Sequence, residues 1–61
     1  MNEPKLLDVV KLLIDVRQID AGSRGTIVEV FASGKAFEVE FCDDDGRTIE
    51  ILTLRREEFE T

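Results

Sequence analysis

The side chains that could do chemistry in this chain are mostly acidic. Its one cysteine, Cys42, is followed directly by three aspartates, and glutamates recur on both sides of this run. There is no histidine, so the commonest general base and metal ligand of proteins is absent. A catalytic cysteine needs an activating base, and the carboxylates around Cys42 disfavour its thiolate. The sequence therefore predicts a protein that is not an enzyme, with Cys42 as a small half-buried side chain.

The consecutive aspartates invite comparison with a calcium-binding loop. In an EF-hand the acidic residues alternate and a glutamate follows at a distance, whereas Asp43, Asp44 and Asp45 are adjacent. Asp and Gly are typical of tight turns. We therefore expect residues 44–46 to form a three-residue hairpin loop, with Gly46 in the left-handed backbone region. This interpretation implies no metal site and no cofactor.

Strands must position these acidic residues, because β-branched and aromatic side chains dominate the apolar runs. At the N-terminus, Asn2 and Pro4 predict a helical turn over residues 5–8, and a longer helix over residues 3–13 is the alternative. Residues 15–24 are expected to form a loop. The pattern predicts strands at 9–16, 26–31, 36–43 and 47–53, then a short helical turn at 54–57 and a very short final strand. Strands at this spacing indicate an all-β fold, a small antiparallel barrel or sandwich.

Alternation within the strands predicts which side chains form the core. Phe37, Val39 and Phe41 share one face of their strand, so we expect Phe41 opposite Ile49 and Val39 opposite Ile51. The preceding hairpin turns near residues 33–34. The same reasoning predicts two further pairs there, Val28 opposite Val39 and Val30 opposite Phe37.

This register brings four glutamates to the outside of the sheet. Glu29 falls opposite Glu38, and Glu40 falls opposite Glu50. Like charges directly across a strand pair cost about 0.2–1 kcal/mol, so the stripe is a reasonable place to look for a cationic partner. The alternatives are a solvated acidic face and, for Ile27, an inward position caused by a bulge after Gly25. The predicted partner-binding residues are Glu29, Glu38, Glu40, Glu50, Leu52 and Ile27.

The charge balance favours a basic protein as the partner. Fourteen acidic and eight basic residues give a net charge of -6, which repels phosphate. The alternative function is association with RNA or the ribosome, through Arg24, Arg17, Arg47 and Lys35. Of four phenylalanines, Phe37 and Phe41 are assigned to the core. The remaining two, Phe31 and Phe59, are too few for a proline-rich ligand, a methyl-lysine cage or stacked bases.

The length of 61 residues predicts one small domain, residues 1–61, with a thin core. No apolar run approaches the roughly 20 residues of a membrane span, and we expect neither a signal peptide nor a membrane partner. A single cysteine forms no internal disulfide, which favours a cytoplasmic location.

The segments "GSRGTIVEVF" and "KAFEVEFCDDDGRTIEILTL" resemble a family of short bacterial domains of unknown function with an SH3-like barrel. The resemblance runs from "LLDVVKLL" to "TLRREEF", and Gly22, Gly25 and Ile27 also resemble a KOW element. It implies five strands with a 3₁₀ turn before the last, and the short fifth strand leaves an edge open to a second copy of the chain. It further implies an antitoxin or immunity-type role, because relatives are encoded near small toxin-like proteins.

Overall fold

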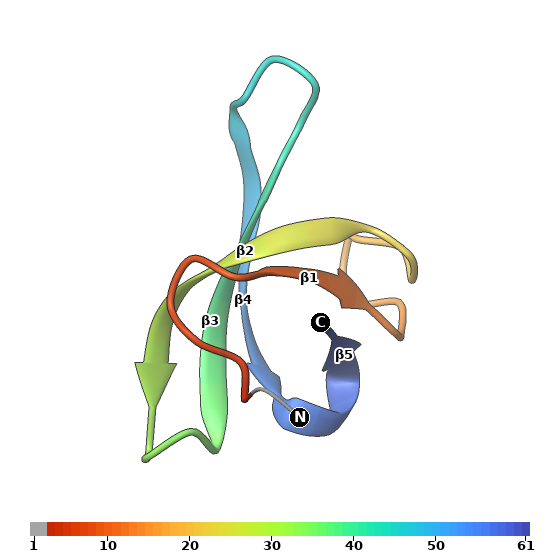
Figure 1. The fold of residues 1–61 in the computed structure, drawn as a ribbon. Helices are drawn as coiled ribbons and strands as arrows, with labels where there is room; N and C mark the ends of the chain where they lie inside the picture. The colour runs from red at the N-terminus through yellow and green to blue at the C-terminus, as the bar shows by residue number, and fades with distance from the viewer. Residues whose placement is uncertain (1–2) are drawn as a thin grey trace.

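The computed structural model describes residues 3–61, which form five antiparallel strands in one sheet and one 3₁₀ turn. The elements are β1 (Val9–Leu12), β2 (Arg24–Phe31), β3 (Ala36–Cys42), β4 (Thr48–Arg55), η1 (Arg56–Glu58) and β5 (Phe59–Glu60). The strand order is β4-β3-β2-β1-β5, and the sheet curls round on itself (Figure 1). The prediction of an all-β fold with five short strands and a 3₁₀ turn before the last is confirmed.

The N-terminal segment differs from the prediction. Residues 6–7 form a turn rather than a helical lead-in, and the alternative longer helix is wrong because β1 begins at Val9. The predicted capping residue Asn2 lies outside the described residues. The backbone N–H of Leu7 donates to the carbonyl of Ile27 at 2.8 Å, and the N–H of Ile27 donates to the carbonyl of Asp8 at 3.0 Å. Pairing with β2 therefore satisfies backbone groups that a helix would have used internally.

β1 is shorter than the predicted strand because its partners end early. It is paired with β2 from Val9 to Lys11 and with β5 at Lys11 and Leu12. The loop predicted at residues 15–24 is confirmed except at its end, because Arg24 already belongs to β2. It contains one isolated bridge between Val16 and Ile19. None of the helical segments in the described part of the chain has the length and hydrophobicity of a transmembrane helix.

The core consists of alternate residues from every strand and one loop residue. Phe37 and Phe59 pack edge-to-face, with ring centroids 5.1 Å apart and an interplanar angle of 84°. Phe59 is therefore a core residue, although the sequence analysis did not assign it to the core. The buried side chains are Val10, Leu12, Ile19, Ile27, Phe37, Val39, Phe41, Leu52, Leu54 and Phe59.

The hairpin between β3 and β4 turns as predicted. The N–H of Asp43 donates to the carbonyl of Arg47 at 2.8 Å, so residues 44–46 form the loop. Gly46 has φ 82, in the left-handed region. This hairpin extends away from the rest of the fold (Figure 1). With the hairpin included, the molecule measures 30 × 19 × 19 Å.

Beyond this turn, a bulge in β4 changes the register. Cys42 lies opposite Thr48, but Phe41 lies opposite Glu50, so Ile49 is an extra residue on β4. The predicted pairs of Phe41 with Ile49 and of Val39 with Ile51 are therefore wrong. The two core residues of β4 are instead Leu52 opposite Val39 and Leu54 opposite Phe37.

A second bulge lies in β2, where Val28 is the extra residue. Ile27 is opposite Val39, and the next ladder pair is Glu29 opposite Glu38. The inward position predicted for Val28 is wrong, and Ile27 takes it, as the bulge alternative had it. Two predicted pairs in this hairpin are confirmed, Glu29 opposite Glu38 and Val30 opposite Phe37.

Gly25 lets β2 pass close to β3. A Cβ built on Gly25 would lie 2.7 Å from Val39 Cγ1, 2.9 Å from the Glu40 carbonyl oxygen and 2.9 Å from Phe41 Cε2. Two of these neighbours are a backbone atom and a core ring, which have no room to move. Glycine is therefore required at the point where the sheet bends.

The two ends of the strand order are β4 and β5, and β5 has only two residues. The predicted short fifth strand is confirmed. Within residues 3–61 no ladder joins β4 to β5, so both have one unpaired edge. Pairing of such an edge with a second copy of the chain stays a prediction.

Candidate functional site

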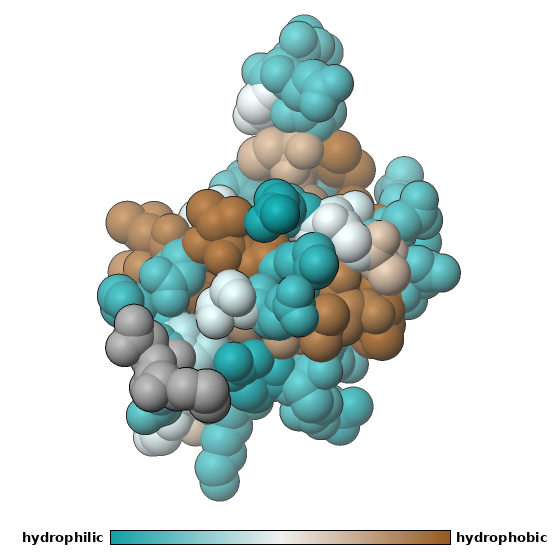
Figure 2. All heavy atoms as spheres, turned by 45° about the vertical axis from the view of Figure 1, so that its right-hand side comes forward, coloured by the Kyte–Doolittle hydropathy of each residue, from teal (hydrophilic) through white to brown (hydrophobic). Residues whose placement is uncertain are grey.

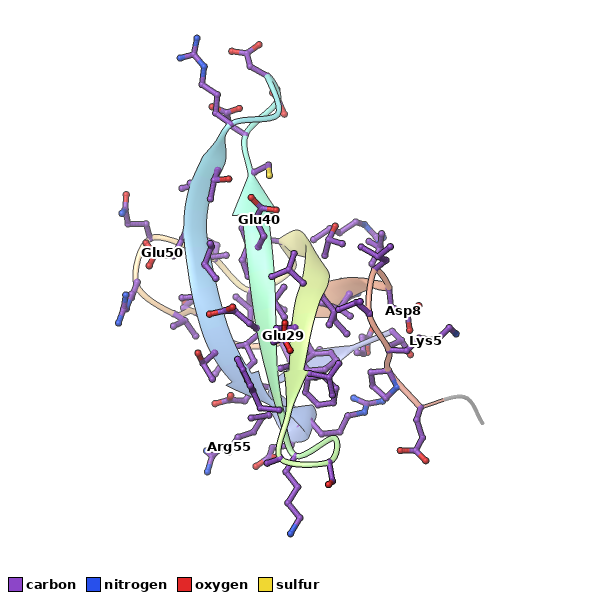
Figure 3. All side chains as sticks on the ribbon, turned by 90° about the vertical axis from the view of Figure 1, so that its left-hand side faces the viewer. Lys5, Asp8, Glu29, Glu40, Glu50 and Arg55 are labelled. Atoms are coloured by element: carbon purple, nitrogen blue, oxygen red, sulfur yellow. The ribbon has the colours of Figure 1, made fainter. Side chains whose placement is uncertain are left out.

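The outer face is defined as the side of β2, β3 and β4 that points away from the core. Figure 3 looks onto this face, with Glu29 labelled on β2 and Glu40 on β3. Because directly opposed residues share a side, the ladder places Glu38 on it together with them. Three of the four predicted glutamates therefore lie together. The pairs that make up the outer face are Glu29–Glu38, Glu38–Thr53, Thr26–Glu40 and Glu40–Ile51.

The three glutamates of the outer face form no ion pair with the described residues. None of the ion pairs found within residues 3–61 includes Glu29, Glu38 or Glu40. Glu38 and Glu40 are half-buried, and Glu40 accepts a hydrogen bond from the hydroxyl of Thr48. The outer face thus holds carboxylates that are partly desolvated and not neutralised.

Glu50 does not belong to this face, which corrects its place in the predicted stripe. The bulge at Ile49 turns it to the same side as Phe41, where its side chain is only 16% exposed. There its Oε2 lies 2.9 Å from Nη1 of Arg17, in the loop between β1 and β2. Arg17 has φ 53, so the loop holds it in the left-handed region. This carboxylate is already paired with a residue of the same chain.

The two predicted apolar anchors are also wrong. Leu52 is 4% exposed and Ile27 is 0% exposed, so neither is accessible to a partner. The exposed apolar side chain that accompanies the glutamates is Ile51, opposite Glu40 and 47% exposed. A sequence signal was available: the predicted register would have paired the aromatic ring of Phe37 with a threonine.

The four basic residues of the RNA-binding alternative are dispersed. Lys35 precedes β3 and Arg47 follows it, so they lie at opposite ends of a seven-residue strand. Such a strand is about 23 Å long. Arg17 is paired with Glu50, and Arg24 lies opposite Lys11 of β1. The structure does not gather these side chains into one basic patch.

The aspartates after β3 act in the turn. Oδ1 of Asp43 accepts hydrogen bonds from the backbone N–H groups of Asp45 and Arg47, each at 2.9 Å. Within residues 3–61 no group of three or more His, Cys, Asp or Glu side chains could hold a metal ion. Cys42 is exposed rather than half-buried, because it lies on the outer face at the end of β3. In Figure 2 the projecting tip of this hairpin is hydrophilic, whereas hydrophobic residues gather on the body of the molecule.

The family model "Domain of unknown function (DUF4926)" matches residues 6–61, a range that contains all five strands and the 3₁₀ turn. No curated protein and no solved structure matches the chain.

Proposed function

We propose a function for this chain, which belongs to the DUF4926 family of domains of unknown function: it is a non-enzymatic module that binds a basic partner protein. The contact surface is the outer face. The observation that carries the proposal is the direct opposition of Glu29 and Glu38, continued by Glu40, without a cation in contact among the described residues. The strand order, with a 3₁₀ turn before β5, supports assigning the domain to the SH3-like barrels.

Electrostatic energy gives this surface a preference for cations. A like-charge pair directly across two strands costs about 0.2–1 kcal/mol, and a lysine or arginine placed between the carboxylates removes that cost. The net charge of -6 adds a long-range attraction for basic proteins. Complementary charge of this kind mainly raises the association rate and selects among partners.

Exposed apolar side chains supply the second component of the surface. Protein interfaces commonly combine an apolar centre with a polar rim. Ile51 lies directly opposite Glu40, and Val9 lies opposite Thr26, which is itself opposite Glu40. Both are exposed, at 47% and 57%. In this proposal they replace the buried Leu52 and Ile27 as apolar contacts.

The type of partner follows from charge and from the family resemblance. A small toxin-like protein with a cationic surface would be masked by these carboxylates, so the proposed role is of antitoxin or immunity type in the bacterial cytoplasm. The dispersed basic residues give no support to an RNA-binding role.

Affinity capture with matched charge variants tests the proposal. The tagged chain is compared with E29Q/E38Q and with D20N/D44N. The second variant also loses two negative charges, but at positions away from the outer face. Asp20 lies in the loop before β2 and Asp44 at the hairpin tip, and neither takes part in an ion pair of the described residues. We expect E29Q/E38Q to capture at least about fivefold less partner than the unmodified chain. The reason is that each half-exposed ion pair between one of these glutamates and the partner is worth up to about 1 kcal/mol.

The control decides between a specific surface and overall charge. D20N/D44N should capture as much partner as the unmodified chain at physiological salt. Equal losses in the two variants would mean that net charge alone attracts the partner, and no loss in either would remove the outer face from consideration.

A further inference from the structure

A shallow hollow lies on the outer side of the molecule, where β2 parts from β3. Its volume is ≈ 210 Å³, and its lining consists of Val9, Arg24, Gly25, Thr26, Glu40 and Cys42. The ladder between β2 and β3 ends at the pair of Thr26 with Glu40. Arg24 and Gly25 instead pair with β1. The hollow therefore occupies the split that opens as β2 changes from one partner strand to the other.

The size of the hollow limits what it can hold. Sites for cofactors and drug-sized molecules enclose about 300–1,000 Å³. A volume of ≈ 210 Å³ is below that range. Because a water molecule takes about 30 Å³ of the liquid, the hollow has room for about seven water molecules. One long side chain of a partner protein matches this volume better than a free small molecule does.

The lining favours a side chain with an apolar stem and a cationic end. Val9 is 57% exposed and offers an apolar wall. Glu40 offers a carboxylate, and the Thr48 hydroxyl, which donates to its Oε2, fixes the orientation of that group. The other carboxylate oxygen, Oε1, takes part in no hydrogen bond of the described residues. Long basic side chains commonly lie with their methylenes on apolar surface and their charge on a polar group.

Arg24 adds a positive charge to the lining of the hollow. It lies two residues before Thr26 on β2, opposite Lys11 of β1. Within the lining, the guanidinium of Arg24 repels a cation, whereas the carboxylate of Glu40 attracts one. An acidic side chain would bind in the reverse sense, but the net charge of -6 and the neighbouring Glu38 oppose an acidic partner.

We infer that the hollow receives one lysine side chain of the basic partner, with the ammonium group on Glu40 and the methylene stem against Val9. This inference rests on the proposed function and deepens it, since it places one partner residue at one end of the outer face. Thr48 is a positioning residue in this arrangement, because it acts only through Glu40.

The experiment uses the ¹⁵N-labelled protein and three peptides. The probe is acetyl-Gly-Lys-Gly-amide, and the controls replace lysine by norleucine, which keeps the stem without the charge, or by glutamate. We expect the lysine peptide to shift the backbone amide signals of Gly25, Thr26, Glu40 and Cys42, and both controls to leave them in place. Equal shifts with norleucine, or shifts spread over Glu29 and Glu38 without those four amides, would overturn the inference.

Two variants should change the affinity of the lysine peptide in opposite directions. E40Q should weaken binding about tenfold, because the ion pair between the carboxylate and the lysine ammonium becomes a hydrogen bond between a neutral amide and that ammonium. R24Q should strengthen binding, because it removes the like charge at the rim. E40Q keeps the size of the side chain, R24Q shortens it, and both changes stay on the outer surface of the sheet. Changes of the same sign in the two variants would contradict the orientation assigned to the lysine.

The result is separable from the test of the proposed function. If E29Q/E38Q loses the partner while the lysine peptide leaves the four amides unshifted, the outer face stands and the hollow is excluded. If the peptide binds at the hollow while E29Q/E38Q retains the partner, lysine recognition stands and the wider acidic surface falls.

Discussion

β2 and β4 flank β3 on its two sides, and each carries one residue more than the stretch of β3 that it faces. In β2 the extra residue is Val28, directly before Glu29; in β4 it is Ile49, directly before Glu50. The same device has opposite results. The bulge in β4 lies between its hairpin turn and Glu50 and turns Glu50 to the inner side. The bulge in β2 lies beyond Glu29 as counted from its own hairpin turn, so Glu29 keeps its outward position opposite Glu38.

The difference lies in what each carboxylate meets. Glu50 meets Arg17 at 2.9 Å and is neutralised within the chain. Glu29 meets another carboxylate, and no ion pair of the described residues relieves it. The place of a single inserted residue relative to the hairpin turn thus decides whether an acidic side chain is used by the fold itself or stays available to a partner.

The largest expected effect tests the bulge in β4. Leu52→Ala should lower the free energy of unfolding by about 2–5 kcal/mol, because it empties a buried position. Ile51→Ala should change it by about 0.5 kcal/mol or less, since Ile51 is 47% exposed. Urea unfolding of both variants measures the difference.

The reverse order, with Ile51→Ala the more harmful change, would mean that β3 and β4 pair without the bulge. A domain of this size has a total stability of about 3–9 kcal/mol, so Leu52→Ala is at risk of not folding. Leu52→Val and Ile51→Val then give the same comparison with smaller losses.

Apolar alternation and turn chemistry were enough to predict the strands and both hairpins. The predicted bounds of β3 and the left-handed Gly46 are close to the structure because short-range preferences determine them. The register of β4 was not predictable by the same means, because Ile49 and Ile51 fit an inward face as well as Leu52 and Leu54 do. What decides is long-range: Phe37 needs an apolar residue across the ladder, and only the bulged register provides Leu54.

The candidate site was predictable only where no bulge lies between a pair of residues and the hairpin turn that sets their register. The opposition of Glu29 and Glu38 was predicted and is confirmed. The ion pair of Glu50 with Arg17 was not predicted, because it joins residues 33 positions apart. It also depends on a loop that holds the backbone of Arg17 in the left-handed region. The hollow also escaped prediction, since it arises where β2 changes partners, and no local pattern marks that point.

A double-mutant cycle on Arg17 and Glu50 sharpens the comparison at intermediate effect. Arg17→Gln and Glu50→Gln should show a coupling of about 0.5–1 kcal/mol in urea unfolding. The value is at the modest end because the Arg17 side chain is 70% exposed. The matched control is the cycle of Arg17→Gln with Glu38→Gln, which should show no coupling. Coupling of Arg17 to Glu38 would contradict the placement of the two carboxylates on opposite sides of the sheet.

The smallest expected effect has an unusual sign. Glu38→Gln should raise the free energy of unfolding by a few tenths of a kcal/mol, because it removes the like charge opposite Glu29. The gain should shrink as salt is added, since screening already weakens the repulsion in the unmodified chain. Asp44→Asn, which removes a charge from the hairpin tip, controls for the change in net charge.

A gain in stability together with a loss of partner capture would distinguish a binding surface from an acidic face that is merely solvated. A solvated face predicts the first result without the second, because a side chain that only meets water has no partner contact to lose. Surfaces that bind commonly retain residues that are costly to the free fold. If Glu38→Gln destabilises the domain instead, Glu38 contributes to the fold through contacts that outweigh the repulsion, and the contrast between the β2 and β4 sides of the sheet loses its energetic basis.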